Sequence, residues 1–122
     1  LCADQGVGVI PWSPLARGAL TRDPEASTAR QETDEFGKTL YGTANSEIAQ
    51  EVAAIAAERG VSRAQVALAW VSRHPAVTAP IVGVTKPHHL DDAIASLDLT
   101  LTDDEVRRLE APYTAQPVQG FA

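Results

Sequence analysis

Two short stretches of the chain combine residue types that could hold a negatively charged ligand. In the first, IVGVTKPHHLDDAI, the hydroxyl of Thr85 and the ammonium of Lys86 come directly before a helix expected to start near Pro87. Proline suits the first helical turn, and the next amides have no partner inside the helix and lie at the positive end of its dipole. Phosphate fits this arrangement best, and Gly83 would let it approach closely. The segment alone is equally compatible with a helix capped by Thr85, with Lys86 in solvent.

The second stretch, PWSPLARGALTR, presents an aromatic ring, a hydroxyl and cationic side chains directly after an expected strand. Trp12 could belong to the core or stack on a planar ring. Ser13, the backbone amides near Leu15, and Arg17 or Arg22 would suit a pyrophosphate. Both stretches follow strands, so we expect them at the same edge of a sheet, where ligands bind in α/β folds.

The histidines and paired acids do not form a convincing metal site or acid–base dyad. His88 and His89 are adjacent, and neighbouring side chains on a helix point about 100° apart. His89 is better placed for a hydrogen bond to a ligand, and Asp92 lies one turn further along the same expected helix. The pair Asp91–Asp92 is more typical of a solvated helix face. We therefore expect no metal.

The elements that would position these residues alternate between strands and helices. Short apolar runs rich in β-branched residues predict strands at Val7–Ile10 and Ile81–Val84. Helical periodicity predicts helices over 45–60, 62–75, 86–97 and 101–110. This order predicts an α/β fold with parallel strands. Two parallel strands cannot cover themselves, so partner strands must come from elsewhere.

The helix ends carry recognisable signals. Asn45 or Thr43 could cap the first helix, and Gly60 could end it. Ser62 with Gln65, and Thr102 with Glu105, have the spacing of capping boxes. We expect Ile48, Val52, Ile55 and Ala56 to form one apolar stripe and Trp70 to be a bulky core residue. The polar stretch 23–43 predicts a long surface loop, with one helical turn around 34–40.

Composition limits the class of protein. The chain has 122 residues, 44% of them hydrophobic and 21% charged, with a net charge of −6 and a pI of about 4.9. These values are ordinary for a globular protein and argue against nucleic-acid binding. A single cysteine, no long apolar run and no signal core favour a cytoplasmic protein without a membrane segment. The chain has no Met and opens on the approach to a strand, so we expect it to be part of something longer.

Taken together, the two ligand stretches resemble a known family. GVIPWSPLARGALT followed by PIVGVTKPHHLDDAIASLDLTLTDDEVRRLE is similar to the last two βα units of the aldo-keto reductases. The stretches TARQETDEFGKTLY and PYTAQPVQGF resemble the bacterial branch of that family. The resemblance implies a (β/α)8 barrel that binds NADPH without a Rossmann domain, with this chain as its C-terminal portion.

The resemblance also implies a role for each matching residue. Trp12 would stack on the nicotinamide ring, and Ser13, Leu15 and Arg17 would follow the pyrophosphate, with Arg30 facing the phosphates from the long loop. Gly83, Thr85, Lys86, His89 and Asp92 would bind the adenosine end, with Thr85 and Lys86 on the 2′-phosphate. The family usually has Asn where Ala93 stands, which weakens the implied adenine contact.

No position matches the family's catalytic Asp, Tyr, Lys and His. Tyr41 and Tyr113 belong to the expected loop and tail, and neither is a candidate catalyst. We therefore interpret 1–122 as the C-terminal NADP-binding portion of an aldo-keto reductase domain, a TIM-barrel fragment with a long loop at 23–43 and a tail at 111–122. The parent would reduce a small aldehyde or ketone with NADP(H), whereas this chain alone would be inactive.

Two other functions stay open at this stage. The chain could belong to a regulatory subunit that binds NADPH without turnover. It could also be an inactive half-barrel whose strand edges need the missing half or a second copy to cover them.

Overall fold

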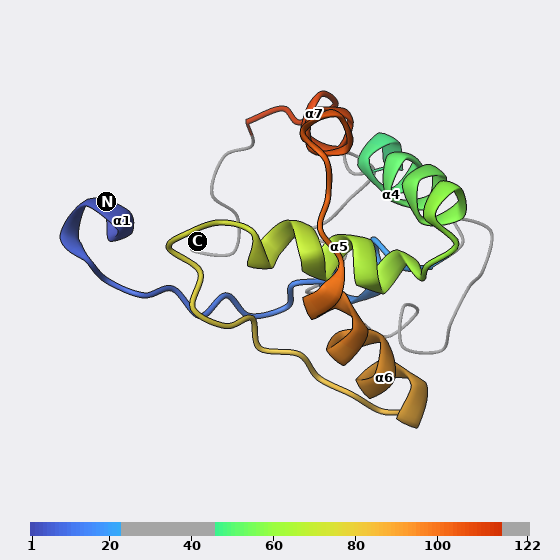
Figure 1. Cartoon of the computed structure of the whole chain (residues 1–122), viewed down its shortest axis with the longest axis horizontal. Helices are drawn as coiled ribbons and strands as arrows, with labels where there is room; N and C mark the ends of the chain where they lie inside the picture. Colours follow the sequence, from blue (N-terminus) through green and yellow to red (C-terminus); the bar gives the residue numbers. More distant parts are fainter. Residues whose placement is uncertain (23–45, 116–122) are drawn as a thin grey trace, which may run out of the picture.

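A computed structural model of the chain describes residues 1–22 and 46–115. Its elements are α1 (Cys2–Gln5), η1 (Ala16–Gly18), α4 (Ser46–Arg59), α5 (Arg63–Ser72), α6 (Pro87–Ala95), η2 (Ser96–Asp98) and α7 (Asp103–Glu110), as Figure 1 shows. The predicted loop at 23–43 with its helical turn, the candidate cap residues Thr43 and Asn45, the site residue Arg30 and most of the predicted tail lie outside the described residues.

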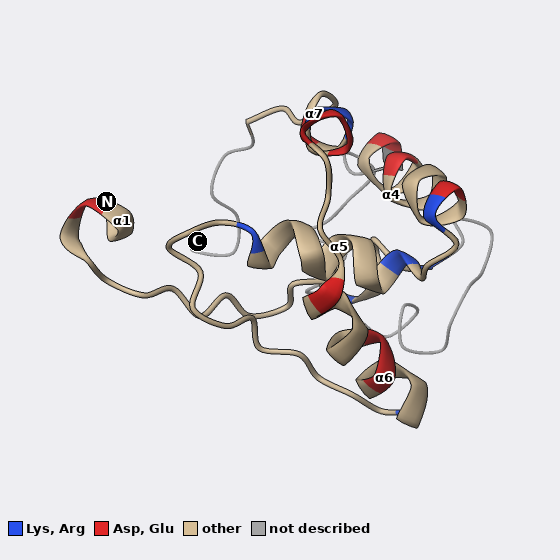
Figure 2. Ribbon diagram, viewed as in Figure 1, with Lys and Arg blue, Asp and Glu red and all other residues tan. Residues whose placement is uncertain are grey.

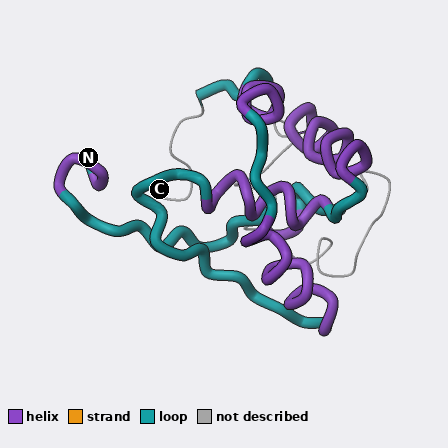
Figure 3. Tube along the Cα trace, viewed as in Figure 1, coloured by secondary structure: helices purple, strands orange, loops and turns teal. Residues whose placement is uncertain are grey.

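The predicted parallel strands are not formed in the described part of the chain (Figure 3). In the described residues, the two predicted strands do not pair with each other: Val9 of the first forms an isolated parallel bridge with Val77, and Ile81 of the second forms one with Trp12. The predicted (β/α)8 barrel fragment with parallel strands is therefore wrong for these residues, which are helices joined by irregular segments.

The reason lies in the surroundings of these segments. Parallel strands are stable when they are paired on both edges and covered on both faces. Here Val7, Ile10, Ile81 and Val84 are all exposed, Ile10 to 63%. Residues with β-branched side chains thus follow their local preference for extended backbone, but the described residues offer no neighbouring strand that would extend the pairing into a ladder.

The predicted helices are formed, and their ends follow the sequence signals. Gly60 follows α4 with a φ of 65°, a left-handed conformation that glycine adopts without steric cost. Ser62 and Gln65 form a complete capping box at the start of α5, and Thr102 and Glu105 form another at α7. The alternative of a helix capped by Thr85 is wrong for α6, because its N-cap is Lys86 and no side chain caps it.

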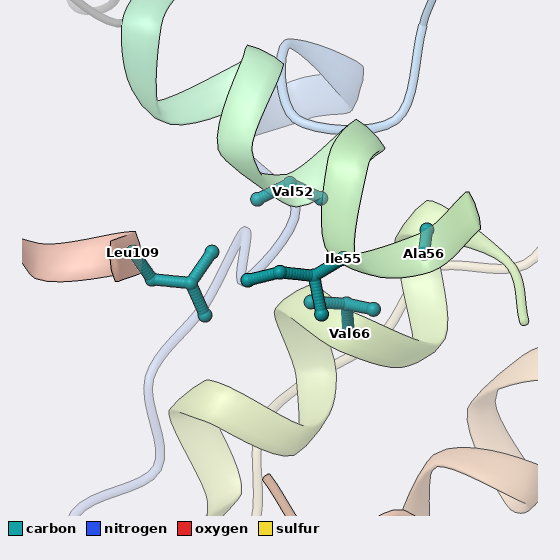
Figure 4. Close-up of a cluster of buried hydrophobic side chains, with 5 residues drawn as sticks. All are labelled: Val52, Ile55, Ala56, Val66 and Leu109. Atoms are coloured by element: carbon teal, nitrogen blue, oxygen red, sulfur yellow. The ribbon is translucent and has the colours of Figure 1, made fainter. Parts of the chain in front are cut away.

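A small apolar cluster joins α4, α5 and α7 (Figure 4). Val52, Ile55 and Ala56 of α4 contact Val66 of α5 and Leu109 of α7, and Ile55 and Val66 are completely inaccessible to solvent. The predicted stripe on α4 is therefore confirmed for these three residues. Burial of each large aliphatic side chain stabilises the fold by about 1.5–3 kcal/mol.

The expected role of Trp70 in the core is wrong. Its side chain is 39% exposed, and its indole Nε1 donates a hydrogen bond of 3.0 Å to a carboxylate oxygen of Glu110. The guanidinium carbon of Arg73 lies 5.6 Å from the centre of the indole ring. Helical spacing predicted burial, but an indole with a polar edge is most stable where that edge reaches a partner at the surface.

Acidic and basic residues both occur on α4 and α7 (Figure 2), and they hold these helices together. The guanidinium of Arg59 binds both carboxylate oxygens of Glu105, at 2.6 and 2.8 Å, and donates a third bond to the carbonyl of Thr100. Arg108 of α7 pairs with Glu51 and Glu58 of α4. Arg59 stands at the negative end of α4 and Glu105 at the positive end of α7, so each charge also favours its own helix.

Glu105 is the acid most affected by these contacts. The hydrogen bonds from Arg59, with those from the backbone and side chain of Thr102, lower the pKa of its carboxyl from 4.5 to about 2, against the opposing effect of burial. The pKa is lower in the folded than in the unfolded chain, so the stabilisation is complete above pH 4.5. It is lost as the pH falls toward 2.

We predict that Glu105→Gln lowers the free energy of unfolding at pH 7 by about 1–3 kcal/mol, because it removes the charge facing Arg59. Glutamine retains an acceptor for the capping box, so α7 still forms. Urea unfolding at several pH values measures the effect, and the difference between the two proteins should vanish as the pH falls from 4.5 toward 2.

Asp104→Asn is the matched control, because the partner of Asp104 among the described residues is the exposed Arg107 on the same helix, at 3.1 Å. Its effect should stay below about 1 kcal/mol. A Glu105→Gln difference that is independent of pH would contradict the assignment.

Candidate functional site

A cavity of about 930 Å³ lies between the segment after Trp12, the segment 83–92 and the facing sides of α4 and α5. It gathers eight of the ten residues that the sequence nominated for a cofactor: Trp12, Ser13, Leu15, Arg17, Gly83, Thr85, His89 and Asp92. Lys86 does not line it but precedes α6 next to Thr85, with its side chain exposed. The remaining residue, Arg30, lies outside the described part.

Backbone hydrogen bonds bring the two segments together. The amide of Val9 donates to the carbonyl of Ala76, the amide of Thr78 donates to Val9, and the amide of Ile81 donates to Pro11, at 2.8–2.9 Å. The segments run in the same direction, so the chain that follows each of them emerges on the same side. Residues from the two sequence stretches therefore share one cavity even though no extended sheet is formed.

The first wall of the cavity has an unusual backbone. Ser13, Ala16 and Arg17 have φ values of 51°, 49° and 54°, in the left-handed region that residues other than glycine seldom adopt. Each such residue costs about 1–2 kcal/mol, and strain of this kind clusters at functional sites. The turn is closed by hydrogen bonds from Ala16 to the carbonyl of Ser13 and from Gly18 to that of Leu15. Its amides are thereby held in one arrangement beside Trp12.

Trp12 presents a large aromatic surface at this wall. Its side chain is 59% exposed, and it forms the last bridge to the neighbouring segment through Ile81. A buried tryptophan would add apolar stabilisation to the fold. Because Trp12 is exposed at the cavity instead, its aromatic surface is available to a planar ligand.

Basic side chains line the same wall. Arg17, Arg22 and Arg63 reach the cavity, and Asp92 is the one acid among its described lining residues. The guanidinium of Arg22 donates to the carbonyls of Gly18 and Arg17, at 3.1 and 3.2 Å. Arg63 was not foreseen, because it lies far along the chain and reads as an ordinary residue at the start of a helix. No local signal in the sequence could have identified it.

The second wall is formed by the start of α6. Lys86 is the N-cap without a capping side chain, and Pro87 is the first helical residue, so the helix begins as the sequence indicated. The hydroxyl oxygen of Thr85 lies 3.4 Å from Nδ1 of His89, and its amide nitrogen lies 3.5 Å from the same atom. Thr85 and His89 are thus neighbours at the mouth of the helix, where an anion would meet positive charge.

Gly83 and His88 complete this wall. A Cβ added at Gly83 would meet no described atom within 4 Å, so packing within the described residues does not demand glycine there. The ring of His88 meets that of His89 edge to face, with centroids 4.5 Å apart. Among the described residues, no group of three His, Cys, Asp or Glu side chains could hold a metal ion.

A second cavity, of about 430 Å³, lies between α4, α5, α7 and the turn residues Pro14, Ala16 and Leu20, and is lined almost entirely by apolar side chains. It lacks the convergent polar groups that fix the orientation of a ligand.

In the part of the chain that the structure describes, no helix has the length and apolarity needed to cross a bilayer.

Comparison with known proteins identifies the family of the chain. Residues 1–113 match the profile described as the aldo/keto reductase family. The chain is 42% identical to versiconal hemiacetal acetate reductase of Aspergillus parasiticus over 96% of its own length and 35% of that protein. It is 41% identical to aldo-keto reductase AMT2 of Alternaria alternata, over 99% of the chain and 33% of that protein.

These relatives are fungal, so they give no support to the bacterial branch that the sequence suggested. The chain spans about a third of the length of each. The family match covers nearly the whole chain and includes both walls of the cavity. The chain therefore belongs to the aldo/keto reductase family.

Proposed function

We propose that this chain is the C-terminal, NADPH-binding part of a reductase that converts aldehydes or ketones to alcohols. The observation that carries the proposal is the shared cavity, which joins Trp12 and the strained turn after it to Thr85, His89 and Asp92. Membership of the aldo/keto reductase family supports a nicotinamide cofactor.

The residues of the cavity fit such a cofactor. Its volume of about 930 Å³ suits a large ligand, since small-molecule sites commonly span about 300–1,000 Å³. Trp12 supplies a face for a planar ring, and the amides of the turn with Arg17 suit a pyrophosphate. The open backbone at Gly83 adds room at the second wall.

The bound cofactor would supply hydride, and the residues of this chain would bind and orient it. Thr85 and Lys86 are placed before α6, where a hydroxyl, an ammonium and the helix dipole could together hold the 2′-phosphate that distinguishes NADPH from NADH. His89 and Asp92, both half-buried, would contact the adenine end.

The reacting carbonyl would need groups that this chain does not supply. We propose that the Asp, Tyr, Lys and His of the family's catalytic set come from the remaining two thirds of a protein of the relatives' length. That part, or a second copy of this chain, would also cover the exposed apolar side chains of Ile10, Ile81 and Val84.

We predict that NADPH quenches the fluorescence of Trp12, because a nicotinamide ring would stack on it. Titration of Trp70→Phe isolates Trp12 and should retain the quenching, whereas Trp12→Phe should lose it. Trp70 is the matched control because its indole is held by Glu110 outside the cavity. Equal quenching in both variants would exclude stacking on Trp12.

We predict that Lys86→Met raises the dissociation constant for NADPH about tenfold, the loss expected for one charge-assisted hydrogen bond. Binding of NADH should not change, because it lacks the 2′-phosphate. Arg107→Met, on the exposed face of α7, controls for a loss of net positive charge. If NADH binding weakens as much as NADPH binding, Lys86 does not recognise the 2′-phosphate.

We predict that the 122-residue chain alone does not oxidise NADPH with a simple aldehyde, although it binds NADPH. The measurement is the loss of NADPH absorbance against a reaction without protein. Turnover above that background would show that the described residues, or those around them, include a catalytic set that the sequence did not reveal.

A further inference from the structure

Arg63 occupies a position that is unfavourable for its own helix. It is the first residue of α5, where the helix dipole is positive and a cation is repelled. The orphan amides there are served by the Ser62–Gln65 capping box, to which Arg63 contributes nothing. No carboxylate among the described residues pairs with it. The helix therefore gives no reason for arginine at this position.

The side chain of Arg63 instead contacts the end of the strained turn. Its guanidinium donates a hydrogen bond of 2.6 Å to the backbone carbonyl of Arg22. The guanidinium of Arg22 in turn donates to the carbonyls of Gly18 and Arg17, and the amide of Arg22 donates to Gly18 as well. These bonds form a continuous path from the start of α5 to the turn that lines the cavity.

The turn needs such a restraint. Ser13, Ala16 and Arg17 adopt left-handed backbone conformations that are unfavourable in an isolated chain. Strained conformations persist only where the surrounding structure holds them. Leu20 packs against the apolar cluster of α4, α5 and α7, and most hydrogen bonds in the turn are local. The Arg63–Arg22 bond adds a polar link to a helix whose neighbouring residues, Val66 and Ala67, are buried.

We propose that Arg63 is a positioning residue that holds the turn from Ser13 to Arg22 in its ligand-binding conformation. The function of the turn rests on the proposed cofactor site, but the restraint itself does not. Arg63 acts through the carbonyl of Arg22, which fixes the guanidinium of Arg22 over Gly18. A Cβ at Gly18 would lie only 3.1 Å from Nε of Arg22, so the two residues are closely fitted.

The test compares Arg63→Met, which removes the donor but keeps an apolar stem, with Arg63→Lys, which retains a cationic donor. Trypsin cleavage after Arg17 and after Arg22, followed by mass spectrometry, reports whether the turn is held. We expect Arg63→Met to cleave about tenfold faster than wild type, as loss of one charge-assisted hydrogen bond implies, and Arg63→Lys to recover part of the protection.

Two further measurements separate positioning from general destabilisation. The urea midpoint of Arg63→Met should equal or exceed that of wild type, because a cation has been removed from the positive end of α5. The dissociation constant for NADPH should rise by a factor similar to that for cleavage. Arg107→Met, exposed on α7, should change neither the cleavage rate nor the dissociation constant for NADPH.

The outcomes distinguish the two proposals. Unchanged cleavage in Arg63→Met, or faster cleavage with an equally lowered urea midpoint, overturns the role of Arg63 whatever happens to NADPH. If Arg63→Met is cleaved faster at an unchanged urea midpoint and the wild-type protein does not bind NADPH, the restraint is supported and the proposed cofactor is overturned. If wild type binds NADPH and Arg63→Met binds it with the same dissociation constant, the link between the restraint and cofactor binding is overturned.

Discussion

The candidate site depends on three backbone hydrogen bonds between Val9–Pro11 and Ala76–Ile81, which bring its two walls together. They fix two segments that are far apart in the sequence in one direction and one register. Every nominated residue in the cavity follows one of these segments. The bonds lie between exposed segments, so their contribution is modest, on the order of 1 kcal/mol each. The arrangement of the site consequently depends on what else restrains its two walls.

The helical part supplies that restraint through its buried apolar cluster and its ion pairs. Ile55 and Val66 bury the α4–α5 contact, and Glu105 both caps α7 and binds Arg59 at the end of α4. Among the described residues, the segments at 7–12 and 76–84 have no comparable apolar cluster, and several of their apolar side chains are exposed. The hydrogen bond from Arg63 to Arg22 joins the turn of the first wall to α5, which packs in the apolar cluster.

What the sequence could predict follows the range of the interactions involved. Capping boxes such as Ser62–Gln65 and the left-handed Gly60 act within a few residues, and the helix boundaries were predicted well from them. The strand at Ile81–Val84 was not formed, because a sheet depends on neighbours that a local pattern cannot supply. The left-handed Ser13 and the contact of Arg63 with Arg22 are likewise tertiary effects. Thr85 and Trp12 could be nominated as site residues because they matched the pattern of a family. Their roles are still predictions.

An acidic chain can hold an anion only if its charges are separated, and the pairing of the carboxylates achieves this. Glu51, Glu58, Glu105 and Glu110 bind arginines of α4 and α7 and the arginine that follows α5, none of which lines the cavity. Arg63 directs its donor at a carbonyl rather than a carboxylate, so its positive charge is not cancelled there. Among the described lining residues, the three arginines Arg17, Arg22 and Arg63 outnumber the one acid, Asp92, although the whole chain carries a net charge of −6. Local potential, rather than net charge, then determines which ligand the site can attract.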